Sequence, residues 1–393
     1  MLHHSRLNAA LLLALSTVLA PLAIRAQNYN QINLVANTAS AGATIVDPNL
    51  VNPWGLSRSA TSPWWIADAG SGLSTVYEGN GTIAPLVVTV PENPLSKSKT
   101  GSPAGIIFNG NPKDFLLGTG DAAAFIFSTL DGTIAAWPSP TGKAVTVFKA
   151  TDGSAFTGLT SANLNGKIYL YAANFSKGRV DLFNSKFAPV DLPSVSNDST
   201  SKPEKVPAFT DSSLPAHYVP FNVQAIGDDI VVTYALDNFS AGPGLGFVDI
   251  FSTAGQLLQR LEHSDWLNAP WGVALAPNDF GAYSHALLIG QFGAGGTTEA
   301  AGTISAYDPI TGKLLGVLEN AAGKPLAIEG LWAITFSNPA PKNSTAGAVS
   351  SNYDDAGAPA AELYFTAGPH HETDGLFGYL APVATENTQG NNQ

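Results

Sequence analysis

The chain has 393 residues, of which 45% are hydrophobic and 12% charged, and its formal net charge is −12 at pH 7. It contains no cysteine, which excludes thiol catalysis and disulfide bonds. An acidic surface disfavours binding to nucleic acids and anionic membranes, and favours cations or neutral ligands. The 39 glycines fit many short strands joined by tight turns.

Residues 1–26 have the pattern of a secretory signal peptide. Arg6 precedes an apolar run from Leu7 to Ile24 that ends in small residues. We expect cleavage after Ala26, with Ala23 as the alternative. No later segment has the length and apolarity of a membrane helix, and the polar residues 382–393 are expected to be disordered. The sequence therefore predicts a secreted or periplasmic protein with no lipid anchor, no membrane insertion and no C-terminal sorting helix.

Six segments of the chain share one pattern. They read "NPWGLS", "SPAGIIF", "FTGLTS", "PFNVQAI", "APWGVAL" and "EGLWAIT". The positions that we align in them are Gly55, Gly105, Gly158, Val223, Gly272 and Ala333. They lie roughly 50 to 65 residues apart, a period that suits the four-stranded blades of a β-propeller with loops of variable length.

The two ends of the repeat array predict how the ring closes. Each repeat continues with further apolar strands, but the sixth has no convincing fourth strand, whereas residues 29–37 form a strand that belongs to no repeat. A ring closes if this N-terminal strand becomes the outer strand of the last blade, which also removes exposed sheet edges. We therefore predict an all-β fold, a single six-bladed β-propeller over residues 27–381, with 191–218 as a long excursion.

Several long motifs carry a resemblance to a known family. The stretches "DPNLVNPWGL", "FIFSTLDGTIAAW", "GPGLGFVDIF", "LNAPWGVALAP" and "LYFTAGP" followed by "DGLFGYL" resemble an uncharacterised family of exported bacterial proteins, some of which carry a PEP-CTERM sorting tail. The resemblance implies a propeller outside the cytoplasm and supplies no activity. This chain lacks the sorting tail, and its "PHHET" loop differs from the more acidic loop of the family.

Propeller geometry predicts where a site would form. In each blade the loop between the second and third strands and the segment leading into the first strand lie on the same face, around the central channel. These places hold oxygen-bearing side chains with aromatic ones beside them, which suits calcium or a sugar. The alternative is that Asp and Asn serve only the turns themselves and that the Pro-Trp-Gly segments pack between blades. The predicted ligand rim is Asn52, Trp54, Asp68, Asp131, Asn222, Asn268, Trp271, Gln291, Trp332, His370, His371 and Glu372.

The adjacent pair His370 and His371 raises the possibility of a transition-metal site. Such a centre needs further ligands, for which Glu372, Asp374 or Asp68 are candidates. Neighbouring residues of an extended strand point to opposite sides, so the two imidazoles share a metal only if the loop is not extended. The alternatives are a solvated loop or one segment of the ligand rim.

The stretch "IEGLWAITF" around Glu329 resembles gluconolactonase-like propellers of the NHL type. The resemblance implies that Glu329, Asn174 and Asp237 hold a divalent metal such as Ca²⁺ in the central channel and that the protein is a metal-dependent hydrolase or lactonase. The alternative is that Glu329 accepts a hydrogen bond between blades.

The sequence thus leaves three functions open. The first is a binding module, without an assured catalytic activity, that takes a glycan, a small molecule or an envelope protein on one face. The second is the calcium-type hydrolase, and the third is a scaffold that binds through its side or its opposite face. We expect a monomer in each case.

Overall fold

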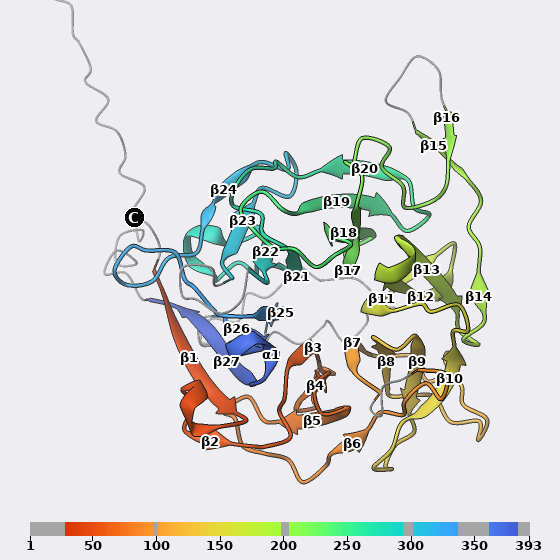
Figure 1. Cartoon of the computed structure of the whole chain (residues 1–393), viewed down its shortest axis with the longest axis horizontal. Coiled ribbons are helices and arrows are strands. Elements are labelled where there is room, and N and C mark those ends of the chain that lie inside the picture. The colour runs from red at the N-terminus through yellow and green to blue at the C-terminus, as the bar shows by residue number, and fades with distance from the viewer. Residues whose placement is uncertain (1–27, 97–100, 198–203, 294–301, 337–360, 384–393) are drawn as a thin grey trace, which may run out of the picture.

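Six antiparallel sheets surround a central axis in the computed structural model, which describes residues 28–96, 101–197, 204–293, 302–336 and 361–383 (Figure 1). The predicted all-β fold and its six blades are confirmed. The predicted signal peptide and nearly all of the predicted C-terminal tail lie outside the described residues.

From the innermost to the outermost strand, the first three blades are built as follows. Blade 1 has β3 (Pro53–Ser57), β4 (Trp64–Asp68), β5 (Leu73–Tyr77) and β6 (Val88–Thr89). Blade 2 has β7 (Pro103–Phe108), β8 (Phe125–Thr129), β9 (Thr133–Trp137) and β10 (Val145–Lys149). Blade 3 has β11 (Phe156–Leu164), β12 (Lys167–Asn174), β13 (Arg179–Asn184) and β14 (Pro189–Val190).

The other three blades follow the same order. Blade 4 has β17 (Tyr218–Ile226), β18 (Asp229–Leu236), β19 (Phe247–Ser252) and β20 (Leu257–Arg260). Blade 5 has β21 (Pro270–Leu275), β22 (Leu287–Gln291), β23 (Ile304–Tyr307) and β24 (Leu314–Val317). Blade 6 has β25 (Leu331–Phe336), β26 (Leu363–Ala367) and β27 (Leu376–Pro382), followed by β1 (Tyr29–Ala36) and β2 (Ile45–Val46).

The N-terminal strand closes the ring as predicted. Strand β1 pairs antiparallel with β27, with Tyr29 opposite Pro382 and Ile32 opposite Tyr379, and β2 adds to β1 in parallel. The first described strand is therefore an outer strand of the last blade. Because this pairing joins residues more than 300 positions apart in sequence, the ring is complete only when both ends of the propeller domain have folded.

Every inner strand contains a register shift near its start. The pairing skips between Pro53 and Leu56 in blade 1, between Pro103 and Gly105 in blade 2, and at the equivalent place in the other four blades. A β-bulge of this kind re-aims one side chain out of the regular alternation. The residues at the bulges are Trp54, Ala104, Thr157, Phe221, Trp271 and Trp332, and five of them belong to one buried cluster.

The residue after the bulge is glycine in four blades because neighbouring inner strands approach closely. A Cβ on Gly105 would lie 2.5 Å from the backbone nitrogen of Leu159 in blade 3, and one on Gly55 would lie 2.5 Å from the carbonyl oxygen of Ala104 in blade 2. No Cβ fits at such distances. Close packing of the inner strands around the axis, and not a turn, therefore requires glycine at these positions.

One aligned position of the fourth repeat is corrected by the structure. We aligned Val223 with the glycines, but Asn222 pairs with Thr233 in the register that Gly105 has with Ser128. Asn222 is therefore the equivalent residue. Its side-chain amide donates a 2.8 Å hydrogen bond to the carbonyl oxygen of Trp271, so it ties blade 4 to the next inner strand.

The excursion between blades 3 and 4 folds into its own hairpin, β15 (Val195–Asn197) and β16 (Glu204–Val206). It is fastened to blade 4 by Arg260, whose guanidinium bonds Asp211 of the excursion and buried Asp249 of β19. Burial raises the pKa of Asp249 to about 6 even though Arg260 stabilises its charge.

Helices are few and short in the described ranges. They are η1 (Ala39–Ala41), η2 (Phe175–Lys177), η3 (Gly281–Tyr283) and α1 (Pro369–Glu372). Over these ranges, no helix is long and apolar enough to cross a membrane.

The close approach of the inner strands can be tested by adding one methyl group. We expect Gly105→Ala to lower the free energy of unfolding by about 2 to 3 kcal/mol, because its Cβ meets backbone that cannot move aside. Gly118→Ala is the matched control, since a Cβ there meets no heavy atom within 4 Å. Urea unfolding of both variants measures the difference, and equal stabilities would contradict the packing described.

Candidate functional site

The segments leading into the inner strands lie beside the loops that follow the second strands. Pro53 pairs with Asp68 and Pro270 pairs with Gln291, so the start of each inner strand meets the end of its neighbour. We call the side of the ring formed by these segments and loops the top face. Figure 1 places α1, in the loop after β26, close to the start of β3.

Three of the predicted rim aromatics are buried on the axis below this face. Trp54, Trp271 and Trp332 are 3%, 4% and 2% exposed. The rings of Trp54 and Trp332 stack with centroids 3.6 Å apart, and Trp271 meets both edge-on at 6.0 and 5.9 Å. These side chains therefore fill the channel, and they offer no open platform in the state described.

The indole nitrogens show how the aromatic core is tied to the blades. Trp271 Nε1 donates to the carbonyl oxygen of Thr157 at 3.0 Å, and Trp332 Nε1 donates to Asn52 Oδ1 at 3.0 Å. The second bond links the core directly to a predicted rim residue of the top face.

Asn52 joins this core to the loop that contains the histidine pair. Its side-chain nitrogen donates to Glu372 Oε2 at 2.8 Å, and its backbone nitrogen donates to the carbonyl oxygen of Asp374 at 3.1 Å. In the same loop the backbone nitrogen of His370 donates to Glu329 Oε1 at 2.9 Å. The structure thus brings Asn52 and Glu329 to the loop of His370 and Glu372, from which the sequence places them far apart. The bond that Glu329 accepts lies within blade 6.

His370 forms a hydrogen-bonded pair with Asp374. The distance between Nδ1 and Asp374 Oδ2 is 2.6 Å, and Asn37 Nδ2 donates to the other carboxylate oxygen at 3.1 Å. Because an ionised carboxylate only accepts, Nδ1 carries the proton and Nε2 keeps its lone pair in the neutral ring. The hydrogen bond from His370 to Asp374, together with the charges of Asp374 and Glu329, raises the pKa of His370.

The backbone of this loop is held in an unfavourable conformation. His370, His371 and Glu372 are consecutive residues with φ of 54°, 57° and 64°. Left-handed backbone costs a residue with a side chain about 1 to 2 kcal/mol. The turn is held in place because His370 donates hydrogen bonds to Glu329 and Asp374, and Glu372 accepts one from Asn52. Strained backbone of this kind is found most often at functional sites, so the turn makes this loop a candidate functional site.

Glu372 is partly buried between the loop and Asn52. Burial raises the pKa of its carboxyl group, and the hydrogen bond from Asn52 opposes part of that rise. Its neighbour His371 is exposed. The loop therefore places one partly buried carboxyl group and two exposed imidazoles at the junction of blades 6 and 1.

Two other acidic residues of the predicted rim, Asp68 and Asp131, accept hydrogen bonds from backbone N–H groups. Asp68 is fully buried, and its Oδ2 accepts the backbone N–H of Thr75 at 2.9 Å. Burial raises the pKa of Asp68 well above its ordinary value. Asp131 accepts the backbone N–H of Asn93 at 2.7 Å and the hydroxyl of Thr129.

The amides of the predicted rim are likewise engaged in loop contacts. Gln291 Oε1 accepts the backbone N–H of Asn268 at 2.9 Å, and Asn268 Oδ1 accepts that of Gly242 at 2.7 Å. These bonds join segments more than 20 residues apart in sequence, so the side chains tie neighbouring loops together rather than serve their own turns. Their role toward a ligand stays a prediction.

The three residues of the expected calcium site have separate partners. Asn174 is fully buried and donates to Ser154 Oγ at 2.9 Å and to Asp181 Oδ2 at 2.6 Å. Asp237 is exposed and pairs with His217 at 3.0 Å. Glu329 faces the His370 loop. Within the described ranges, no group of three or more His, Cys, Asp or Glu side chains is placed to hold a metal ion.

An exposed aromatic residue on the top face was missed by the sequence analysis. Phe239, in the loop between β18 and β19, is 61% exposed and has φ of 59°. Its ring stacks on Phe175 with centroids 4.2 Å apart, Phe175 contacts Phe221, and Phe221 contacts Trp332. The signal was present, because "NFS" occurs at 174–176 and again at 238–240 in the equivalent loops of blades 3 and 4.

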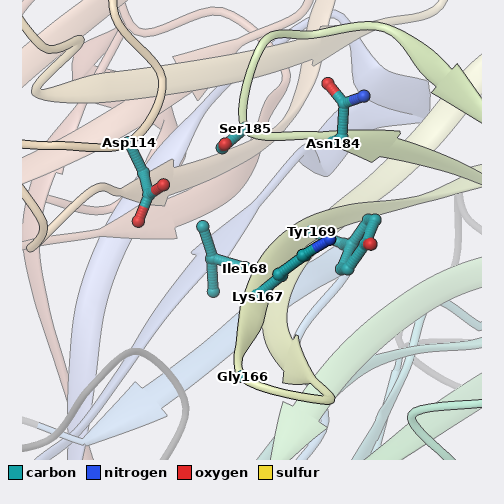
Figure 2. Close-up of a pocket in the computed structure, with 7 residues that line it drawn as sticks. All are labelled: Asp114, Gly166, Lys167, Ile168, Tyr169, Asn184 and Ser185. Atoms are coloured by element: carbon teal, nitrogen blue, oxygen red, sulfur yellow. The ribbon is translucent and has the colours of Figure 1, made fainter.

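A small pocket of about 150 Å³ lies on the opposite face, between blades 2 and 3 (Figure 2). Asp114 and Lys167 are its charged lining residues. Lys167 and Tyr169 alternate with Ile168 along β12, so they point to the other side of the strand from Ile168. The lining side chains therefore come from both faces of β12, and they form a weaker candidate than the His370 loop.

The fold and the top face define a six-bladed β-propeller with a closed axis and a polar, aromatic loop face. No protein-family profile matches the chain. The expected bacterial exported family therefore stays a prediction.

Three curated relatives are proteins of Acanthamoeba polyphaga mimivirus, and all are described as uncharacterized. Protein R648 is 27% identical over 376 residues, covering 91% of this chain and 81% of its own length. Protein L690 is 25% identical over 374 residues, covering 89% and 85%. Protein R640 is 27% identical over 252 residues, which cover 61% of this chain and only 43% of R640.

Two solved structures match most of the length of this chain. Streptogramin B lyase matches with a TM-score of 0.46 and 11% identity, covering 91% of this chain and 98% of that one. Hydrazine synthase of Kuenenia stuttgartiensis matches with a TM-score of 0.44 and 11% identity, covering 82% and 76%. Neither these structures nor the relatives assign an activity to this chain.

Strain in the His370 loop can be measured by relieving it at one residue. We expect His371→Gly to raise the free energy of unfolding by about 0.5 to 1 kcal/mol, because glycine adopts positive φ without a steric cost. Lys113→Gly is the control, since Lys113 is exposed and its φ is not positive. In urea unfolding, the Lys113→Gly protein should be as stable as the wild type or less stable. A His371→Gly protein that is less stable than the wild type would contradict the presence of strain at residue 371.

Proposed function

We propose that the protein is a binding propeller that takes a glycan on its top face. The observation that carries the proposal is the exposed ring of Phe239, which stacks on Phe175 and so connects to the buried aromatic core. An exposed aromatic ring that is held in place by packing beneath it offers a flat apolar surface to a ligand.

The chemistry of the top face fits a neutral, hydroxyl-rich ligand. Phe239 supplies a flat apolar surface, and the exposed imidazoles of His370 and His371 with the carboxyl group of Glu372 supply hydrogen-bonding groups. The net charge of −12 disfavours acidic ligands. The signal peptide expected at residues 1–26 supports a secreted or periplasmic location, where such a ligand is accessible.

The positions of the three expected calcium ligands support a hydrolase less well than a binding function. Asn174, Asp237 and Glu329 each contact different residues, and the aromatic rings of Trp54, Trp271 and Trp332 occupy the axis on which that site was expected. A binding function needs neither a metal in the channel nor a free path through it.

The proposal predicts that Phe239→Ala lowers glycan binding at least tenfold without a loss of stability. Removing an exposed anchor costs about 1.4 kcal/mol for each tenfold loss of affinity. The measurement is binding of the labelled mature protein to an array of bacterial surface glycans, followed by titration of the best ligand.

Leu258→Ala is the matched control, because Leu258 is 52% exposed on the outer strand of blade 4, away from the top face. It should bind like the wild type. Equal binding by wild type and Phe239→Ala, or no glycan bound by the wild type, would overturn the proposal.

A further inference from the structure

We propose that His370 is a general base that activates water for hydrolysis of an acyl ester presented on the top face. This function goes beyond ligand binding. It requires no metal and no cofactor, because water and one positioned base are sufficient reactants for ester hydrolysis. Asp374 acts as a positioning residue for the imidazole.

The first step of the argument is the orientation of the ring. Asp374 Oδ2 lies 2.6 Å from His370 Nδ1, and the Asp374 side chain is only 16% exposed. Asn37 holds the other carboxylate oxygen, and the backbone N–H of Gly375 donates to Asn37 Oδ1 at 2.9 Å. The imidazole is therefore fixed by a carboxylate that is itself fixed, the relation in which a histidine works as a base.

The second step is access. The side chain of His370 is 54% exposed, so Nε2 reaches the solvent of the top face while Nδ1 is engaged. The charged or titratable neighbours are Asp374 and Glu372 in the same loop, Glu329 before β25, and His371. The hydrogen bond to Asp374 and the two nearby acidic charges together increase the basicity of His370.

The third step is a comparison with a second His–Asp pair on the same face. His217 Nδ1 lies 3.0 Å from Asp237 Oδ2, but these side chains are 73% and 47% exposed. A pair that is this exposed is screened by water and loosely held. His370 differs in having a carboxylate partner that is mostly buried, and in having a second residue, Asn37, that orients that partner.

The reaction is a transfer of an acyl group to water. His370 Nε2 takes one proton from a water molecule as the water oxygen forms a bond to the acyl carbon. The tetrahedral intermediate then breaks its bond to the alcohol oxygen, which receives the proton from Nε2. One ester and one water molecule give one carboxylic acid and one alcohol, and the imidazole returns to its starting state.

The test uses p-nitrophenyl acetate, a small activated ester, with the mature protein and release of p-nitrophenolate as the readout. We expect His370→Gln to lower the protein-dependent rate at least tenfold, since general bases contribute about 10² to 10⁴. His217→Gln is the matched control and should keep the wild-type rate. The rate should rise with pH as His370 loses its proton, with an inflection above the ordinary histidine pKa of about 6.5.

Two further readouts separate a base from a merely structural residue. Asp374→Asn should lower kcat and move the inflection of the pH profile downward, because the neutral amide no longer stabilises the imidazolium. Nitrogen-15 NMR should find the proton of neutral His370 on Nδ1.

Three results would overturn the proposal: a wild-type rate no higher than that of free imidazole at equal concentration, a His370→Gln rate within twofold of wild type, or a proton on Nε2. The probe carries no sugar, so its outcome is independent of glycan binding. If the protein bound no glycan, the result of the ester hydrolysis assay would still be valid. If it hydrolysed no ester, the result of the glycan-binding experiment would still be valid.

Discussion

The structure depends on how closely six inner strands approach one axis. At the residue after the bulge in blades 1, 2 and 5, which is Gly55, Gly105 or Gly272, the backbone of the next blade occupies the space that a Cβ would need. The bulge that permits this approach also turns one side chain per blade toward the centre. Large aromatic residues at four of these positions then fill the space that the ring encloses. Close packing and a closed channel therefore have the same origin.

Closing the axis determines where the protein can meet a ligand. When indole rings fill the channel of a propeller, its loops are the surface that a ligand can reach. In this protein the loops are bound to the aromatic core. Asn52 accepts a hydrogen bond from Trp332 and donates one to Glu372, so the rigid core holds the strained loop that carries His370. Phe239 is connected to the same core through Phe175 and Phe221. Rigid support from below is what positions exposed groups for binding or proton transfer.

Much of this architecture could be predicted from the sequence, because each blade corresponds to one copy of a sequence repeat. The six repeats and the unpaired strand near the N-terminus predicted the blades and their closure. The Val223 alignment was wrong by one residue, because the bulge residue cannot be located in "PFNVQAI" without the pairing. Trp54 was assigned to the rim because it stands at the entry into the first strand of its repeat, whereas the bulge turns its ring inward, in line with the alternative of packing between blades.

The details of the site could be predicted only in part. Propeller geometry predicted that Asn52 and the His370 loop share a face, and the structure places them in contact. The left-handed turn at His370, His371 and Glu372 could not be predicted from the sequence, because positive φ is uncommon for residues other than glycine, even though histidine adopts it more often than most. It exists because long-range bonds to Asn52 and Glu329 hold it, and the pairing of His370 with Asp374 follows from that turn.

The most direct test of a closed axis is hydrogen exchange at the indole nitrogens of Trp271 and Trp332, followed by NMR in deuterated water. If the rings fill the channel and donate to Thr157 and Asn52, both protons should exchange as slowly as the most protected amides of the inner strands. Exchange within minutes, while those amides remain protected, would show water in the channel and contradict the account.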